Sequence, residues 1–270
     1  MCRRPVLNPP ARPTVVSLRD VGKTFSSGTT ALQHLDLDIR QGEILSLLGP
    51  SGCGKSTALR IIAGLGEASS GNVAWAGGGM DHSRDVGFVF QEPTLMPWAS
   101  VFDNVWLPSR LKGVSRKAAR DAVMQALDSV GLTAFAQAYP RELSGGMRMR
   151  VSIARAMVTR PRLLLMDEPF AALDEITRQK LNDDLMRLQA ELGWTVVFVT
   201  HSVFESVYIS DRIVVMAARP GRAFAELIID AERPRGAAFR TTPVYVDYCR
   251  QASAALTSAI GRAAETVDGH

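Results

Sequence analysis

Short apolar runs and amphipathic stretches alternate along most of the chain, a pattern typical of α/β proteins. Residues 15–18 are largely apolar, and residues 35–40 alternate strictly between apolar and polar, which predicts two antiparallel strands with one face in water. Residues 44–48, 71–75 and 85–90 predict three further strands. The first of these three is almost entirely apolar, so we expect it to be buried on both faces.

The alternation stops in the middle of the chain. Residues 93–104 are rich in Met and aromatic residues without a clean period, and we expect an irregular connector there. Ser115 is expected to cap a helix that runs to Val130 and closes at Gly131. Residues 92–145 are therefore predicted to form a mainly helical insert.

Helices and strands alternate again in the second half. One helix is predicted to open at residues 143–147 and to end at Pro161, and a second to run from about Glu175 to Leu192. Apolar strands are predicted at residues 163–166, 195–200, 212–217 and 225–229. The tail has weaker signals, with one helix expected near Tyr245 to Ile260.

Together these elements predict an α/β fold, with a mixed sheet core, an antiparallel β subdomain and a helical insert. We expect residues 14–230 to form one domain, residues 1–13 a disordered basic arm and residues 231–270 a C-terminal extension. The arm holds four prolines, and its three arginines supply most of the net charge of +4. The body is nearly neutral and offers no basic stripe for nucleic acid.

No apolar run reaches the roughly 18 residues of a membrane span, and the N-terminus lacks the apolar core of a signal peptide. The three cysteines have no paired spacing, which fits a reduced cytoplasmic setting without a disulfide framework or a zinc site. We therefore expect any association with a membrane to come through a partner.

A glycine-rich stretch, GPSGCGKST, follows the strand at residues 44–48 and precedes a predicted helix at residues 58–63. Strand, turn and helix in this order are the context of a phosphate-binding P-loop, in which backbone N–H groups hold an anion at a helix N-terminus. Lys55 would add a positive charge near the β and γ phosphates, and the Ser56 hydroxyl would suit Mg²⁺. The predicted nucleotide-binding residues here are Gly49, Pro50, Ser51, Gly52, Cys53, Gly54, Lys55, Ser56 and Thr57.

Polar residues follow three other predicted strands. Gln91, Asp167 and His201 all stand at carboxyl ends of strands, where open α/β sheets bind their ligands. Glu168 follows Asp167 directly. Phe25 lies in the first hairpin, where it is either an aromatic residue of the core or of a sheet edge, or a platform on which an adenine ring stacks.

These motifs, in this order, resemble the nucleotide-binding subunits of ABC transporters, which are P-loop NTPases. The resemblance covers residues 15–229 and rests on Phe25, GPSGCGKST, Gln91, LSGGM at 143–147, LLLMDE at 163–168, AALD at 171–174 and His201. The runs at residues 91–105 and 211–221 resemble those of importer ATPases of the nitrate, sulfonate and taurine type.

The resemblance implies a catalytic role for three residues. Glu168 would be the general base that polarises the attacking water, and His201 would hold the γ-phosphate and this water in line. Gln91 would bind both Mg²⁺ and the water. Ser56 would be a direct ligand of Mg²⁺, and Asp167 would orient the ion through its waters.

The resemblance also implies a second copy of the chain. Ser144, Gly145 and Gly146 would reach the ATP bound by the partner subunit, so that two sites form only in a head-to-tail dimer. Asp174 would contact the partner's site. Three positions depart from the usual motifs, since the family often has Gln at Met147, Gly at Ala171 and Asp at Ser202.

The function that the resemblance implies is that of a motor subunit. ATP and Mg²⁺ would drive an integral membrane permease, served by a separate solute-binding protein, from the cytoplasmic face of the inner membrane. Nitrate, alkanesulfonates, taurine and pyrimidine-type precursors are all open as the solute. Residues 91–106 would dock on the permease through Trp98 and Trp106, unless both are core residues of the insert.

A different class of function is a non-transport ABC ATPase that acts on nucleic acid or ribosomes. Such chains usually carry two ATPase domains in tandem or a long inserted coiled coil, and this sequence has neither. A GTP-binding switch or a small-molecule kinase is a third reading, but the chain has no NKxD motif, and its LSGG sequence would be unexplained.

Overall fold

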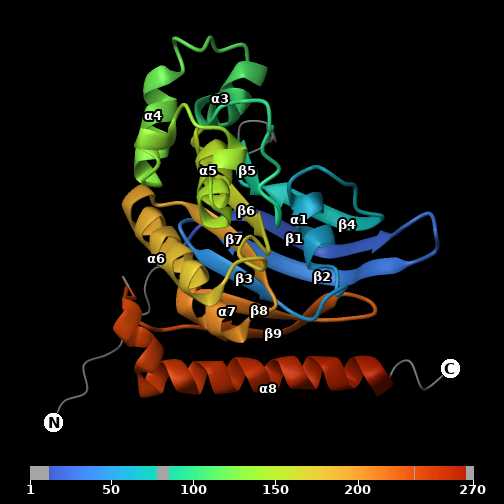
Figure 1. The fold of residues 1–270 in the computed structure, drawn as a ribbon. Coiled ribbons are helices and arrows are strands. Elements are labelled where there is room, and N and C mark those ends of the chain that lie inside the picture. Colours follow the sequence, from blue (N-terminus) through green and yellow to red (C-terminus); the bar gives the residue numbers. More distant parts are fainter. Residues whose placement is uncertain (1–11, 78–84, 234, 266–270) are drawn as a thin grey trace.

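The computed structural model describes residues 12–77, 85–233 and 235–265, which form two β-sheets and a set of helices around them (Figure 1). The strands are β1 (Thr14–Thr24), β2 (Thr30–Arg40), β3 (Ile44–Leu48), β4 (Ser70–Trp75), β5 (Val86–Val89), β6 (Leu163–Asp167), β7 (Thr195–Thr200), β8 (Arg212–Ala217) and β9 (Arg222–Ile228). The helices are α1 (Lys55–Ile62), α3 (Val101–Leu111), α4 (Arg120–Ser129), α5 (Gly145–Met157), α6 (Glu175–Leu192), α7 (Val203–Ile209) and α8 (Pro243–Glu265). Short 3-10 helices span Thr133–Phe135, Pro140–Glu142 and Ala237–Thr241.

The larger sheet has six strands in the order β5-β6-β7-β3-β8-β9. Its first five strands are parallel, and β9 is antiparallel to β8. Alternate residues of β3 and β7 enter two different hydrophobic cores, because successive side chains of a strand point to opposite faces. The sheet is therefore covered on both faces, as its continuous apolar strands predict.

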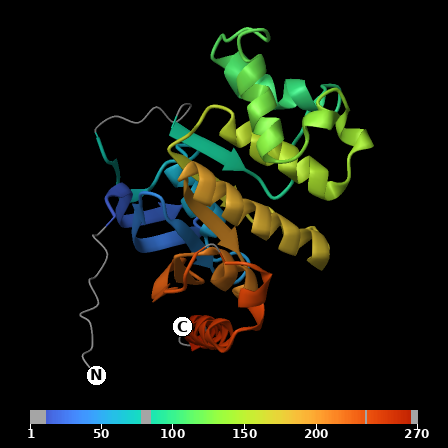
Figure 2. The same ribbon diagram turned by 90° about the vertical axis from the view of Figure 1, so that its left-hand side faces the viewer.

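The smaller sheet is antiparallel, in the order β2-β1-β4, and forms the predicted β subdomain. Helices α3 and α4 form a lobe that stands apart from both sheets, and α8 runs along the opposite end of the molecule (Figures 1 and 2). The mixed sheet, the antiparallel subdomain and the helical insert of the prediction are thus confirmed.

Several predicted boundaries agree with the structure to the residue, namely those of β3, β7, β8 and α6. The connector predicted at residues 93–104 is wrong in its second half, because α3 begins at Val101. Pro108 and the aromatic residues hide this helix in the sequence, whereas the structure starts it with a cap in which Ser100 accepts the Asp103 N–H.

The start of α4 was also placed too early. The helix begins at Arg120, five residues after Ser115. The Ser115 Oγ does accept a backbone N–H, that of Ala118 at 3.2 Å, but it caps a separate turn. Helix α7 was missed, since it has only seven residues.

The two tryptophans of the insert differ in burial. Trp98 is 77% exposed, so a core role is wrong for this residue. Trp106 packs against the main core and donates its indole N–H to the Val114 carbonyl at 3.0 Å. The core alternative therefore holds for Trp106 alone.

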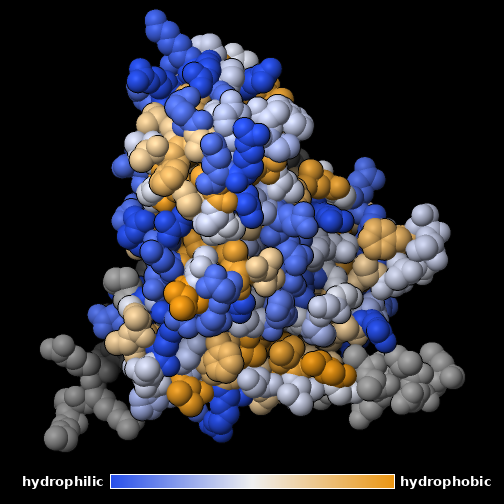
Figure 3. All heavy atoms as spheres, viewed as in Figure 1, coloured by the Kyte–Doolittle hydropathy of each residue, from blue (hydrophilic) through white to orange (hydrophobic). Residues whose placement is uncertain are grey.

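The C-terminal extension packs on the domain through α8. Tyr245, Cys249, Ala252 and Ala259 are buried along one face of this helix. Hydrophobic side chains gather along α8 and the strands above it, while hydrophilic side chains predominate on the lobe of α3 and α4 (Figure 3). None of the helices in the described ranges combines the length and the apolar character that a membrane span requires.

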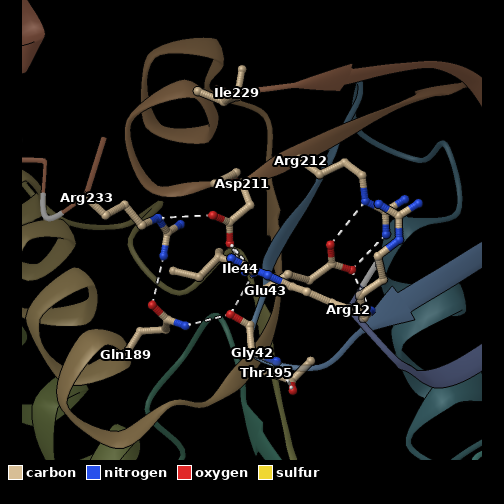
Figure 4. Close-up of polar contacts among 12 residues, drawn as sticks. Arg12, Gly42, Glu43, Ile44, Gln189, Thr195, Asp211, Arg212, Ile229 and Arg233 are labelled. Atoms are coloured by element: carbon tan, nitrogen blue, oxygen red, sulfur yellow. Dashed lines mark hydrogen bonds and ion pairs between the residues drawn. The ribbon is translucent and has the colours of Figure 1, made fainter. Parts of the chain in front are cut away.

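A polar network joins the segments before β1 and after β9 to the amino-terminal ends of the central strands (Figure 4). Asp211 accepts the Ile44 N–H at 2.8 Å and pairs with Arg12 at 3.3 Å and with Arg233 at 3.2 Å. Arg12 was assigned to the disordered arm, of which residues 1–11 lie outside the described residues. Arg233 also donates to Gln189 at 2.8 Å, so the extension is tied to α6 as well.

The Glu43–Arg212 pair is the buried ion pair of this network, with side chains that are 3% and 4% exposed. The Arg212 guanidinium lies 2.8 Å from one Glu43 oxygen and 3.2 Å from the other. It also pairs with Glu226, which is 46% exposed, at 3.1 Å. Arg212 thus has one buried and one exposed carboxylate partner.

We expect Glu43→Gln to lower the free energy of unfolding by about 3 kcal/mol, because it leaves a buried guanidinium without its buried counter-charge. Glu226→Gln is the matched control, since it removes the exposed partner of the same arginine, and its cost should stay below about 1 kcal/mol. Urea denaturation of both variants measures the difference, and equal losses would contradict this account of Arg212.

Glu205 is a second buried carboxyl group, and no arginine or lysine in the described ranges forms an ion pair with it. Its two oxygens accept from Thr200 at 2.5 Å and from Asn182 at 3.3 Å. Burial raises the pKa of Glu205 above its ordinary value of 4.5, although these two hydrogen bonds and the charges of Arg178 and His201 oppose the rise. The folded chain therefore holds this proton more tightly than the unfolded chain.

The contribution of Glu205 to stability should accordingly be present below pH 4.5 and be lost as the pH rises above that value toward the folded pKa. Glu205→Gln keeps a side chain that can form hydrogen bonds but removes the charge. We expect this variant to have a higher Tm than the wild type at pH 8, with the gap closing near pH 4.5. Thermal unfolding at both pH values tests the sign, and a gap that widens in acid would be the opposite result.

Candidate nucleotide-binding and catalytic site

A cleft of about 620 Å³ opens at the carboxyl ends of the central strands. The strand order β5-β6-β7-β3 sets the turns after these four strands side by side, as the rule for open α/β sheets requires. The cleft is lined by Phe25, Thr29, Thr30, Ala31, Ser51, Gly52, Gly54, Lys55, Ser56, Thr57, Gln91, Asp167, Glu168 and Arg219. It therefore brings together most of the residues predicted to bind nucleotide and Mg²⁺.

The P-loop connects β3 to α1 and wraps around the Lys55 ammonium group. The Nζ atom donates to the Gly49 carbonyl at 2.8 Å and to the Pro50 carbonyl at 2.9 Å. Gly54 precedes the helix with φ 90°, and a Cβ atom there would lie 2.7 Å from the Ala31 carbonyl oxygen. Only glycine fits this position, so the turn that directs N–H groups into the cleft depends on it.

Ser56 and Asp167 present adjacent oxygens to the cleft. The Ser56 hydroxyl donates to Asp167 Oδ1 at 2.8 Å. Burial raises the pKa of Asp167, and the neighbouring Glu168 charge adds to the rise, while the Ser56 hydrogen bond opposes it. A hydroxyl and one carboxylate are a donor set that suits Mg²⁺, which takes its remaining ligands from phosphates and waters. The residues present thus fit the ion.

Glu168 points away from Asp167, toward Lys55 and His201. Its carboxylate lies 3.6 Å from the Lys55 Nζ and 3.2 Å from the His201 Nδ1. Its backbone has φ 46°, in the left-handed region, and its N–H donates to the Val199 carbonyl at 3.1 Å. The backbone conformation therefore separates two consecutive carboxylates into different surroundings, which the assignment of different roles requires.

Phe25 and Gln91 border the cleft from opposite sheets. Phe25 lies in the β1–β2 turn with 45% of its surface exposed, so the core alternative for this residue does not fit. The Lys23 ammonium lies 5.6 Å from the centre of its ring. Gln91 follows β5 and is exposed at the cleft.

The residues predicted to reach a partner's nucleotide do not line this cleft. Ser144 caps α5 by accepting the Met147 N–H at 3.2 Å, and Gly145 and Gly146 form the first turn of that helix. Asp174 caps α6 by accepting the Thr177 N–H at 2.9 Å. Of the P-loop residues, Gly49, Pro50 and Cys53 are not among those that line the cleft.

The sequence analysis missed Thr29, Thr30, Ala31 and Arg219 as cleft residues. The first three come after Ser26, Ser27 and Gly28, the turn that follows Phe25, and this turn was the available signal. Arg219 lies in the β8–β9 turn, and the dipeptide Pro220-Gly221 marked that turn without indicating where it lies.

Comparisons with known proteins identify the family of this chain. Residues 32–171 match the ABC transporter family. An uncharacterised ABC transporter ATP-binding protein of Methanocaldococcus jannaschii is 46% identical over 219 residues, or 81% of either chain. The aliphatic sulfonates import ATP-binding protein SsuB 1 of Pseudomonas savastanoi pv. phaseolicola is 46% identical over 224 residues, which cover 82% of this chain and 89% of that protein.

Solved structures of ABC cassettes share the fold. The protein cbiO1 of Clostridium perfringens, part of the ABC transporter complex cbiONQ, matches with a TM-score of 0.72 at 29% identity over 80% of this chain and 88% of that one. A dimeric ATP-binding cassette in a post-hydrolysis state, bound to ADP and Pi, matches with a TM-score of 0.69 at 34% identity over 80% of this chain and all of that one. The chain therefore belongs to the ABC transporter family, as one of its ATP-hydrolysing cassettes.

Proposed function

We propose that this cassette is the motor subunit of an importer and energises the uptake of a small solute through a separate membrane permease. The observation that carries the proposal concerns the segment that follows Gln91. Gln91 lines the cleft with the residues for ATP hydrolysis, and the segment that follows it displays the exposed Trp98. Relatives named as aliphatic sulfonate import proteins favour that class of solute over nitrate or pyrimidine precursors. They also favour transport over action on nucleic acid or ribosomes.

Binding of ATP would use the cleft from end to end. The adenine ring would stack on Phe25, and the phosphates would lie on the N–H groups of the P-loop beside Lys55. Mg²⁺, held by Ser56 and by Asp167 through water, would neutralise charge on the phosphates. Gln91, at the cleft edge, would sense whether the ion and the attacking water are in place.

Glu168 would act as the general base. Its carboxylate would accept the proton of the attacking water while the γ-phosphate is transferred. The left-handed backbone, Lys55 and His201 together restrict where this carboxylate points. His201 would keep the water and the γ-phosphate in line, a role that positions groups rather than one that transfers the proton.

Two copies would hydrolyse ATP as a head-to-tail dimer. The turn at Ser144, with Gly145 and Gly146, is an N–H-rich helix start outside the cleft of its own chain, and so is free to meet the partner's ATP. Dimeric cassettes among the solved relatives support this assembly. Because ATP would be part of the interface, its binding would favour closure and its hydrolysis would release it.

The permease would dock on the segment of residues 93–100. Asn104, which is buried, holds this segment by donating to the carbonyls of Met96, Ala99 and Ser100 at 3.0–3.1 Å. Arg155 donates to the carbonyls of Pro93 and Thr94 at 2.8 Å. The segment is therefore a fixed platform, and the tryptophan it displays is a side chain typical of interface hot spots.

The cassette would lie at the cytoplasmic face of the membrane as a peripheral subunit, and a solute-binding protein would deliver the solute.

The general-base assignment is tested by Glu168→Gln. We expect the turnover number to fall by at least about 100-fold, because the amide cannot accept the proton, while ATP affinity stays within about threefold. ATP should also trap the dimer, which size-exclusion chromatography detects. Glu191 is an exposed residue near the C-terminal end of α6, so Glu191→Gln is the control and should retain turnover. A Glu168→Gln protein with near-normal turnover would refute the assignment.

The docking surface is tested by Trp98→Ala in an affinity pull-down from native membranes in mild detergent, with bound proteins identified by mass spectrometry. We expect the wild type to recover a polytopic permease and Trp98→Ala to recover at least about tenfold less, as for a hot-spot residue. Ile228→Ala removes another exposed apolar side chain, from β9 and far from the insert, and should recover as much as the wild type. Recovery of nucleic acid or soluble partners alone would oppose the transport role.

A further inference from the structure

We propose that Arg219 contacts the nucleoside end of the bound ATP, through the base or the ribose, and strengthens nucleotide binding. This inference rests on the proposed nucleotide site. The residue stands in the turn between β8 and β9, which contributes none of the motifs that identified the cleft, and neither the motifs nor the comparisons give this turn a role in binding.

The position of Arg219 is the first observation. The residue lines the cleft together with Phe25, Thr29 and Thr30. The residue is exposed, and within the described residues its side chain makes no hydrogen bond or ion pair. A residue that lines the cleft thus carries a guanidinium group with five donors and no protein partner among the described residues.

The backbone of Arg219 is the second observation. Six residues other than glycine have a positive φ in the described part of the chain, and two of them, Glu168 and Arg219, line the cleft. Arg219 has φ 59°, a region that is unfavourable for arginine and that glycine or asparagine would occupy more readily. An arginine at such a position suggests that its side chain is needed there.

The anchoring of the turn is the third observation. The Gly221 N–H donates to the Ala31 carbonyl at 3.0 Å, and the Gly221 carbonyl accepts the Gln33 N–H at 2.9 Å. A Cβ atom at Gly221 would lie 2.2 Å from the Cys53 carbonyl oxygen, so the turn is pressed directly against the P-loop. Arg219 is therefore presented to the cleft by a fixed turn rather than by a free loop.

The two hydrogen bonds of Gly221, with Ala31 and Gln33, indicate which end of the nucleotide Arg219 meets. The turn is bonded to the start of β2, the strand that leads away from Phe25 and its turn. The phosphates belong at the other end, near the Lys55 ammonium. A guanidinium group can donate to ribose hydroxyls and can lie flat on an adenine ring, so it suits the nucleoside end by either contact.

The test compares ATP with inorganic tripolyphosphate, which has the phosphates but no nucleoside. Arg219→Asn removes the guanidinium group and places at φ 59° a residue that tolerates this region, so the fold should be retained. By isothermal titration calorimetry, we expect the Kd for ATP to rise about tenfold and the Kd for tripolyphosphate to stay within about twofold. Arg219→Gly, which also tolerates this φ, should give the same result.

Two further variants separate the possible failures. Arg222→Asn changes an arginine of β9 that does not line the cleft, and both Kd values should match those of the wild type. Lys55→Ala should weaken both ligands strongly, and if it weakens neither, the proposed nucleotide site itself is wrong. If Lys55→Ala weakens both while the Arg219 variants bind ATP normally, or lose ATP and tripolyphosphate equally, the site stands and the inference about Arg219 is overturned.

Discussion

The parallel pairing of β3 with β7 on one side and β8 on the other fixes where the P-loop lies relative to the other cleft residues. The register is set over the whole of β3, from Ile44 opposite Val196 to Leu48 opposite Thr200. Since the strands are buried on both faces, a slip of one residue would exchange the side chains of two cores at once. This strong constraint holds Lys55, Glu168 and His201 within reach of one another.

The charged side chains of the cleft each have a different contact partner. Lys55 lies between loop carbonyls and the Glu168 carboxylate, while Asp167 faces the Ser56 hydroxyl instead. The left-handed backbone at Glu168 directs two consecutive carboxylates to different parts of the cleft. Local strain thus gives the two carboxylates different surroundings, as the different roles proposed for them require.

Much of this arrangement could be predicted from sequence, because it depends on local signals. Apolar runs gave the bounds of β3, β7 and β8, and the residues at strand ends were therefore placed correctly. Helix α3 was not found, because its start depends on the Ser100 cap and on packing that masks Pro108. Trp98 and Trp106 look alike in sequence and differ only in tertiary packing. Arg219 was missed for a related reason, since its turn is located by contacts with Ala31 and Gln33 far back in the chain.

The topology also has a consequence for how the chain is made. Strand β3 pairs only with β7 and β8, so on the ribosome it has no partner until residues 195–217 have emerged. At about 5–20 residues per second, this interval is on the order of ten seconds or more. During this interval the apolar segment ILSLL and the unformed P-loop have no neighbouring strands to pair with. Non-local parallel pairing is also intrinsically slow. The nascent chain should therefore need chaperone protection until its last central strands are synthesised.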